Sequence, residues 1–212
     1  MTTIRAHGTG ESHHRAERAT VSAHISVASR DRSRSIAEAS SLHNRIAERA
    51  HGLRERGDAT WHAADPISTW TRKTYEQGSK SKVILEYVTS SRVRIKLANL
   101  DLVASLVTEL AEAGVRTSVD WALTEAFRLQ CERRARKAAV AEARARAEDY
   151  ADALGERIDR VAIVEEPAEG APLAAQARFA SANAGGGEAE VSIPEITVRA
   201  TVRGEFETAP AR

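Results

Sequence analysis

The chain has 212 residues and a mass of 23.0 kDa, which is enough to bury a hydrophobic core. Its 31 basic and 30 acidic residues leave a net charge of +1, so no overall field favours nucleic acid or an anionic membrane. Cys131 is the only cysteine, the first ten residues lack the apolar core of a secretion signal, and no apolar run is long enough to span a bilayer. We therefore expect a soluble, cytoplasmic protein that binds neither nucleic acid nor a membrane.

Alternation of apolar and polar residues, which is typical of half-buried strands, recurs along much of the chain. It predicts strands at 2–10, 17–28, 82–97, 117–123, 158–164 and 194–207. Pro66 lies within 58–81, where we expect an irregular strand or an edge strand because proline cannot donate to a sheet ladder. Ser90 and Ser91 predict either a bend or a bulge in the strand that contains them.

Apolar residues at helical spacing predict three helices, at 36–53, 102–110 and 126–154. Asp31 or Ser33 is the expected N-cap of the first helix, and Asn99 or Asp101 that of the second. The third helix has a small residue at every fourth position: Cys131, Ala135, Ala139, Ala143, Ala147 and Ala151. Such a stripe allows the backbone of a neighbouring segment to approach closely.

Strands with one polar face, interspersed with helices, indicate an α+β fold. We expect an antiparallel β-sheet packed by about three α-helices in a single domain that covers residues 1–212. Prolines and a run of three glycines predict a flexible loop at 165–190.

The order of these segments resembles the SIMPL-domain family, also called domain of unknown function 541. The matching segments are Gly8–Gly10 with Ala19–Val21, Ser91–Leu97 with Leu100–Leu102, Ala138–Gly155, Val161–Glu165 and Pro194–Phe206. The resemblance implies an opening hairpin formed by the first two segments. Members include bacterial periplasmic stress-related proteins and a mammalian protein that binds an interleukin-1-receptor-associated kinase. Some relatives assemble into homo-oligomers, and the family has no agreed catalytic residues to carry over.

Four histidines lie near the predicted first hairpin, at positions 7, 13, 14 and 24. Imidazoles brought together by two strands could bind zinc, which prefers nitrogen and sulfur ligands. The short paired spacings of a zinc site are absent, and solvated or capping histidines explain the pattern as well. We expect no metal and no cofactor.

Cys131 is followed by Arg133 and Arg134, and nearby arginines lower a thiol pKa when they point at the sulfur. A redox-active thiol is one interpretation of this position. The other is a small residue in the packing stripe of the third helix.

The same helix contains a basic segment that a nucleic-acid site could use. Its basic residues are Arg133, Arg134, Arg136, Lys137, Arg144 and Arg146. Aromatic residues for stacking bases are not interleaved with them, and acidic residues dilute the charge. Intrahelical pairs such as Glu142 with Arg146 favour a solvated face instead.

The sequence contains no phosphate-binding loop and no nucleophile elbow, so we expect no enzymatic activity. Our leading hypothesis is a self-associating protein-interaction module, with a homo-oligomer or another protein as partner and a role connected with stress. The candidate interface is formed by Ala135, Ala139, Ala143 and Ala147, or by sheet edges. The alternative is a small-molecule or lipid binder, with a pocket between sheet and helices near Trp61, Trp70 and Trp121.

Overall fold

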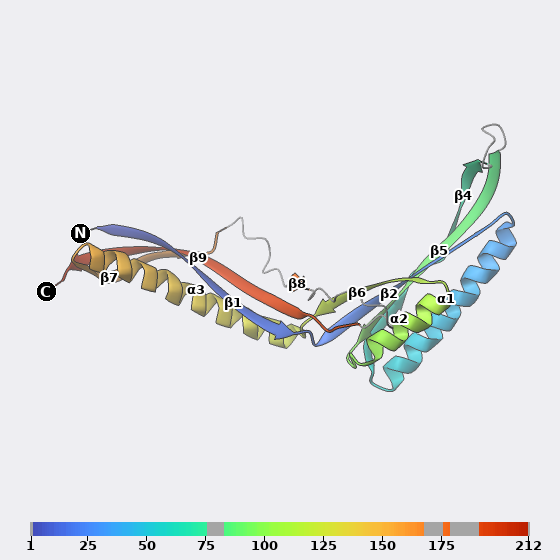
Figure 1. The fold of residues 1–212 in the computed structure, drawn as a ribbon, viewed down its shortest axis with the longest axis horizontal. Helices are drawn as coiled ribbons and strands as arrows, with labels where there is room; N and C mark the ends of the chain where they lie inside the picture. Colours follow the sequence, from blue (N-terminus) through green and yellow to red (C-terminus); the bar gives the residue numbers. More distant parts are fainter. Residues whose placement is uncertain (1, 76–82, 168–175, 179–190, 212) are drawn as a thin grey trace, which may run out of the picture. The chain divides into compact units, whose positions relative to one another are not determined.

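A computed structural model describes residues 2–75, 83–167, 176–178 and 191–211 of the chain. Within them the chain divides into two compact units, each assembled from separate segments. Unit 1 comprises Met1–Ala16, Ala122–Ala182 and Ser192–Arg212, and unit 2 comprises Glu17–Trp121 and Asn183–Val191. Both units combine strands with helices, so the predicted α+β class is confirmed (Figure 1).

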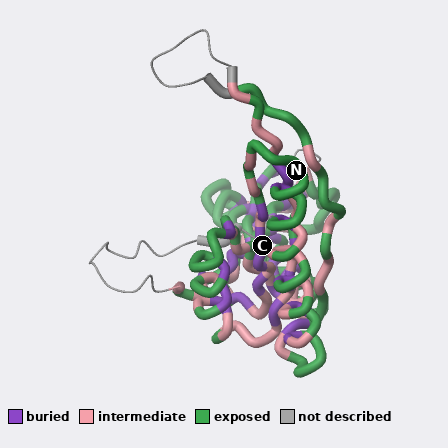
Figure 2. Tube along the Cα trace, turned by 90° about the vertical axis from the view of Figure 1, so that its right-hand side faces the viewer, coloured by how far each residue is buried: buried purple, intermediate pink, exposed green. Residues whose placement is uncertain are grey.

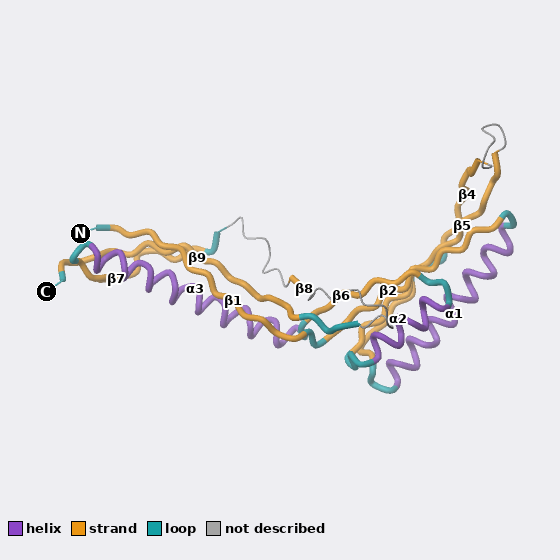
Figure 3. Tube along the Cα trace, in the orientation of Figure 1, coloured by secondary structure: helices purple, strands orange, loops and turns teal. Residues whose placement is uncertain are grey.

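Unit 1 is a four-stranded sheet covered by one long helix. Its elements are β1 (Thr3–Arg15), α3 (Glu125–Ala153), β7 (Glu156–Glu165), β8 (Gln176–Arg178) and β9 (Glu195–Pro210). The strand order is β1-β9-β7, β8 also pairs with β9, and all three pairings are antiparallel. Alternate residues of β9 from Ile196 to Phe206 are buried, and α3 runs along β1 and β9 (Figure 3).

Unit 2 is a five-stranded sheet with two helices on one face. Its elements are β2 (Arg18–Ser29), α1 (Arg32–Glu55), β3 (Ala59–Ala64), β4 (Ser68–Tyr75), β5 (Val83–Leu97), α2 (Leu102–Glu112) and β6 (Arg116–Ala122). The strand order is β3-β5-β2-β6, and β4 also pairs with β5. Apolar residues of β2 and β5 form one core with Leu53 of α1 and Leu106 of α2, as the alternating periodicity predicts.

The chain alternates between buried and exposed positions in both units (Figure 2). In β2, for example, Ala19, Val21, Ala23 and Ile25 are buried on the helix-covered face.

Among the described residues, no helix combines the length and apolar character that crossing a membrane would require.

Three details of the sequence-based prediction are wrong. β1 and β2 do not form a hairpin, because β1 pairs with β9 and β2 pairs with β5. The segment predicted to be one irregular or edge strand is two strands, β3 and β4, separated around Pro66. The ladder between β2 and β5 runs without a register shift through Ser90 and Ser91, which excludes the bulge, while the alternative of a bend stays a prediction.

Two further predictions concern residues that the structure describes only in part. The expected loop at 165–190 contains the short strand β8, and 168–175 and 179–190 lie outside the described residues. The expectation of one domain over residues 1–212 stays a prediction.

Candidate functional site

The small-residue stripe of α3 is packed against the sheet of its own unit. The buried positions of this helix include Cys131, Ala135, Ala139, Ala143, Ala147 and Ala151. A Cβ atom added to Gly8 would lie 2.0 Å from the carbonyl oxygen of Ala139, and one added to Gly10 would lie 2.0 Å from that of Ala135. The two backbones approach this closely because both surfaces lack bulky side chains. The candidate interface residues Ala135, Ala139, Ala143 and Ala147 therefore serve a contact within the chain.

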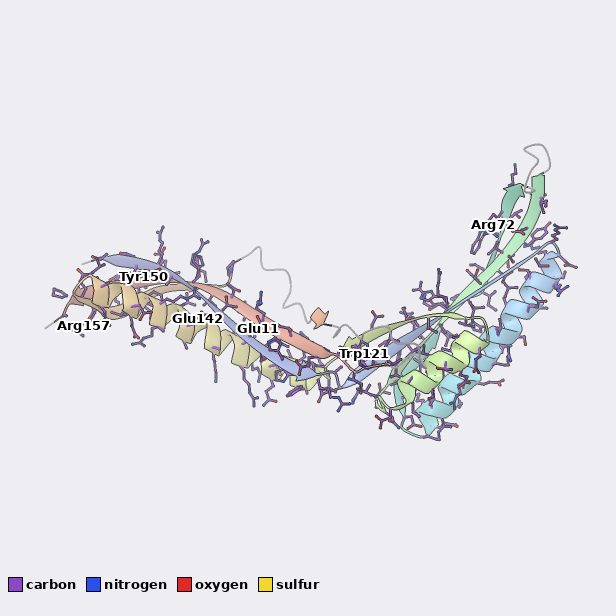
Figure 4. All side chains as sticks on the ribbon, in the orientation of Figure 1. Glu11, Arg72, Trp121, Glu142, Tyr150 and Arg157 are labelled. Atoms are coloured by element: carbon purple, nitrogen blue, oxygen red, sulfur yellow. The ribbon has the colours of Figure 1, made fainter. Side chains whose placement is uncertain are left out.

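Glu142 ties the same helix to β1 through a backbone hydrogen bond (Figure 4). The amide N–H of Thr9 donates to Oε2 of Glu142 at 2.5 Å, and Arg146 forms an ion pair with the same carboxylate. The pKa of Glu142 lies below its usual range, mainly because its carboxylate accepts the hydrogen bond from Thr9. Burial opposes this shift, and the positive charge of Arg146 adds to it. Because β1 is an edge strand, this carboxylate occupies a backbone donor that would otherwise be open to another strand.

Cys131 is fully buried in the stripe of α3. An oxidant in solution reaches a thiol only where the sulfur is accessible. A redox role for Cys131 would thus require α3 to separate from the sheet, whereas the packing interpretation needs no such opening.

The four histidines lie on two strands, β1 and β2, that do not pair with each other. His24 lies on β2 of unit 2, and the other three lie on β1 of unit 1. His13 contacts Thr197 Oγ1 through Nδ1 at 3.0 Å and Glu11 through Nε2 at 3.2 Å. Within the described ranges, no three potential metal-ligating side chains come together.

Four arginines of α3 form ion pairs with acidic residues on or near the helix. The pairs are Arg128 with Glu125 and Glu132, Arg136 with Glu132 and Glu166, Arg144 with Glu148, and Arg146 with Glu142. The predicted pair of Glu142 with Arg146 is among them. These contacts agree with the solvated-face interpretation of the basic segment.

The three tryptophans do not line a common pocket. Trp61 and Trp70 are 41% and 49% exposed, and the ladder sets them opposite Lys96 and Val88 of β5. Trp121 lies on β6, at the other edge of the strand order, and packs against the helix-covered core. Trp61 shares the face of Lys96, which alternates with the core residues of β5, so Trp61 and Trp121 lie on opposite faces.

The edge strand β7 exposes apolar side chains. Val161, Ile163 and Val164 are between 43% and 47% exposed, and β7 is the last strand in the order of its sheet. A register shift between Val161 and Ile163 leaves Ala162 without a direct partner on β9. Val161 and Val164 lie opposite Phe206 and Gly204 on the α3 side, and Ile163 lies opposite Glu205 on the other face.

The match to a protein family covers nearly the whole chain. The family model SIMPL, described as "Protein of unknown function (DUF541)", matches residues 4–206. The chain belongs to the SIMPL family. The comparison with curated proteins found no match. Because the SIMPL description assigns no activity, the functional argument depends on the surfaces of this chain.

Two surfaces of this SIMPL protein were not among the sites predicted from the sequence. The apolar run Val161–Val164 was correctly predicted to be a strand, but the exposure of its side chains at the edge of the sheet was not predicted. The basic residues Arg92, Arg94 and Lys96 alternate along β5, in a segment that was predicted only to be a strand. The three alternate cations are visible in the sequence, whereas the exposure of β7 depends on the place of this strand in its sheet.

Proposed function

We propose that this SIMPL protein is a non-enzymatic, self-associating interaction module and that β7 is the strand through which two copies meet. The observation that carries the proposal is the exposure of Val161, Ile163 and Val164 on an edge strand. An apolar edge strand offers both backbone hydrogen-bonding groups and side chains to another strand. The other edge, β1, is partly occupied by Glu142 of α3, which makes β7 the more open of the two edges.

The sequence of β7 is complementary to itself in one antiparallel register. If Arg160 of one copy lies opposite Glu165 of the other, Val161 lies opposite Val164. A twofold axis then repeats both pairs, as an isologous dimer requires. Within the chain, Arg160 and Glu165 lie opposite Glu207 and Arg203, which share one face, while Val161 and Val164 lie on the other face.

This register therefore brings together side chains that point to the same side of the sheet, with two valine pairs flanked by two ion pairs. Cross-strand pairs of this kind stabilise an antiparallel ladder by about 0.2–1 kcal/mol each. Arg160 already forms an ion pair with Glu207 at 2.7 Å, so Glu165 of the second copy would extend an existing charge network.

Light scattering on a size-exclusion column tests the proposal with the full chain. We expect a mass of twice 23.0 kDa, or a larger even multiple. Val164→Lys and Glu165→Arg should each shift the population toward the 23.0 kDa monomer. The first substitution puts a charge into the apolar pairing, and the second places two arginines opposite each other.

Leu129→Lys is the matched control, because Leu129 is 40% exposed on α3 and lies outside β7. It should leave the mass unchanged. A monomeric parent protein, or equal dissociation by Leu129→Lys and Val164→Lys, would exclude β7 as the interface.

A further inference from the structure

The face of the unit 2 sheet opposite α1 and α2 has no described helix or strand of that unit packed over it. The ladder fixes which side chains share this face. Lys96 lies opposite both Thr20 of β2 and Trp61 of β3, while Arg92 lies opposite His24. These residues alternate with the buried residues of the core, such as Val93 and Ile95, and so they point away from the helices.

Four cations gather on this open face: Arg92, Arg94, Lys96 and Arg116. Successive cations on β5 are two positions apart in the sequence, which corresponds to about 7 Å along the strand. Arg94 forms an ion pair with Asp65 at 3.0 Å. Within the described ranges the other three cations have no ion pair, which leaves their charge available to an anion.

His24 shows that these charges act on a common region. Burial, the charge of Arg92 and the charge of Arg116, in that order, lower the pKa of its imidazole. Arg92 and Arg116 come from β5 and β6, on either side of β2. Like charges held around one side chain repel each other, and an anion bound between them relieves that repulsion.

Two exposed tryptophans lie on the same face. The guanidinium carbon of Arg94 is 5.6 Å from the ring centroid of Trp61, so a cation and an aromatic ring already stack there. Trp70 lies opposite Val88, which is an even number of residues from Lys96 and therefore on the same side of β5. Lys96 lies at the level of Trp61, and Arg94 and Arg92 lie between this level and that of Trp70, which is roughly 26 Å away along the strand.

We infer that this face binds single-stranded nucleic acid, with phosphates on Arg92, Lys96 and Arg116 and bases stacked on Trp61 and Trp70. A sheet that combines cations with exposed aromatic rings provides both interactions that such a strand requires. An acidic peptide would use the cations but would leave the two indole rings without a specific role. A duplex would keep its bases stacked inside, away from a flat sheet.

The basic segment of α3, the nucleic-acid candidate in the sequence, differs from the open face of unit 2 in both respects. There Arg136, Arg144 and Arg146 are paired with glutamates, and the segment lacks interleaved aromatic residues. On unit 2 the strand pairing brings Trp61 beside Lys96, although 35 positions separate them in the chain.

The test is fluorescence anisotropy of a labelled oligo-deoxythymidine of about 12 nucleotides titrated with the full chain, a length within the range of single-stranded sites. From about 50 to 200 mM salt, three phosphate contacts should give a slope of roughly −2 in a plot of log K against log salt. Arg92→Gln, Lys96→Gln and Arg116→Gln should each reduce the steepness of this slope by about 0.7. Trp61→Leu and Trp70→Leu should each weaken binding about tenfold at constant slope.

Arg133→Gln on α3 is the control for the loss of one exposed arginine and should change neither affinity nor slope. Circular dichroism and thermal melting of each variant separate a lost contact from a lost fold. Absence of binding at low salt would overturn the inference. The inference would also be overturned if poly-glutamate bound as tightly as the oligonucleotide and the tryptophan variants did not weaken binding. That result would assign the face to an acidic peptide.

Discussion

Gly8 is the residue at which the contact between β1 and α3 is least tolerant of change. A Cβ atom there would lie 2.0 Å from the carbonyl oxygen of Ala139 and 2.4 Å from the amide nitrogen of Ala143. Both are backbone atoms of a helix and cannot move independently. We expect Gly8→Ala to lower the free energy of unfolding by about 1–3 kcal/mol, measured by urea denaturation.

Gly52 is the matched control, since it also lies in a regular element but has space around it. The nearest atom to an added Cβ is a terminal nitrogen of Arg56, at 3.5 Å on a flexible side chain. Gly52→Ala should raise stability by about 0.5–1 kcal/mol, because alanine is the better helix former. Equal effects of the two substitutions would contradict the close contact of β1 with α3.

Glu142 should make stability depend on pH in the acid range. Folding lowers the pKa of this carboxyl from its ordinary value of 4.5, mainly through the amide of Thr9. A group whose pKa is lowered by folding stabilises the fold above its unfolded pKa, and this contribution is lost as pH falls through the folded pKa. Glu142→Gln should therefore flatten the loss of stability below about pH 4.5 in denaturation curves.

Glu148→Gln is the corresponding control, because Glu148 forms an ion pair with Arg144 on the exposed side of the same helix. This variant should retain more of the acid dependence than Glu142→Gln. The opposite ranking would show that the bond to Thr9 is not formed in solution.

At the scale of elements, the two shorter helices begin differently even though each has an aspartate at its N-cap. The Asp31 carboxylate accepts hydrogen bonds from the amides of Ser33 and Arg34, at 2.8 and 3.2 Å. Asp101 makes no such side-chain bond to α2. We expect Asp31→Ala to cost about 1 kcal/mol of stability, whereas Asp101→Ala should change it by only a few tenths, as measured by thermal unfolding.

The sequence predicted most elements because their determinants are local. Alternation along β2, β5 and β9 and apolar spacing along α1 and α2 are visible in short windows, and Asp31 was a correct candidate cap. β7 was also predicted as a strand. Its exposure was not, since exposure depends on the position of a strand within its sheet and not on its own residues.

At the scale of the whole molecule, the pairing of strands could not be inferred from neighbouring segments. Adjacency in the sequence favoured a hairpin of β1 with β2, yet β1 pairs with β9, so that Thr3 lies opposite Glu207. Gly8 and Gly10 were the local indication of a close approach, but only the fold identifies α3 as the neighbour. Residue type alone groups the three tryptophans and the four histidines, whereas the strand pairing separates Trp61 from Trp121 and His24 from the other three histidines.

Because β9 lies between β1 and β7, the sheet of unit 1 cannot form without this C-terminal strand. A chain that ends at Pro194 lacks β9 and leaves both β1 and β7 without the strand that pairs with them. It retains Val191, which packs against the core of unit 2. We expect hydrogen exchange to show loss of amide protection throughout β1, α3 and β7, with protection in β2 and β5 preserved.

A chain that ends at Pro210 keeps all of β9 and is the control for shortening the C-terminus. It should retain protection in both units. If the chain ending at Pro194 still protects the amides of α3, the helix does not need the completed sheet, and the stripe of alanines must be stabilised by another contact. If protection in β5 is lost as well, the core of unit 2 requires unit 1 to fold, and the two compact units form one cooperative domain.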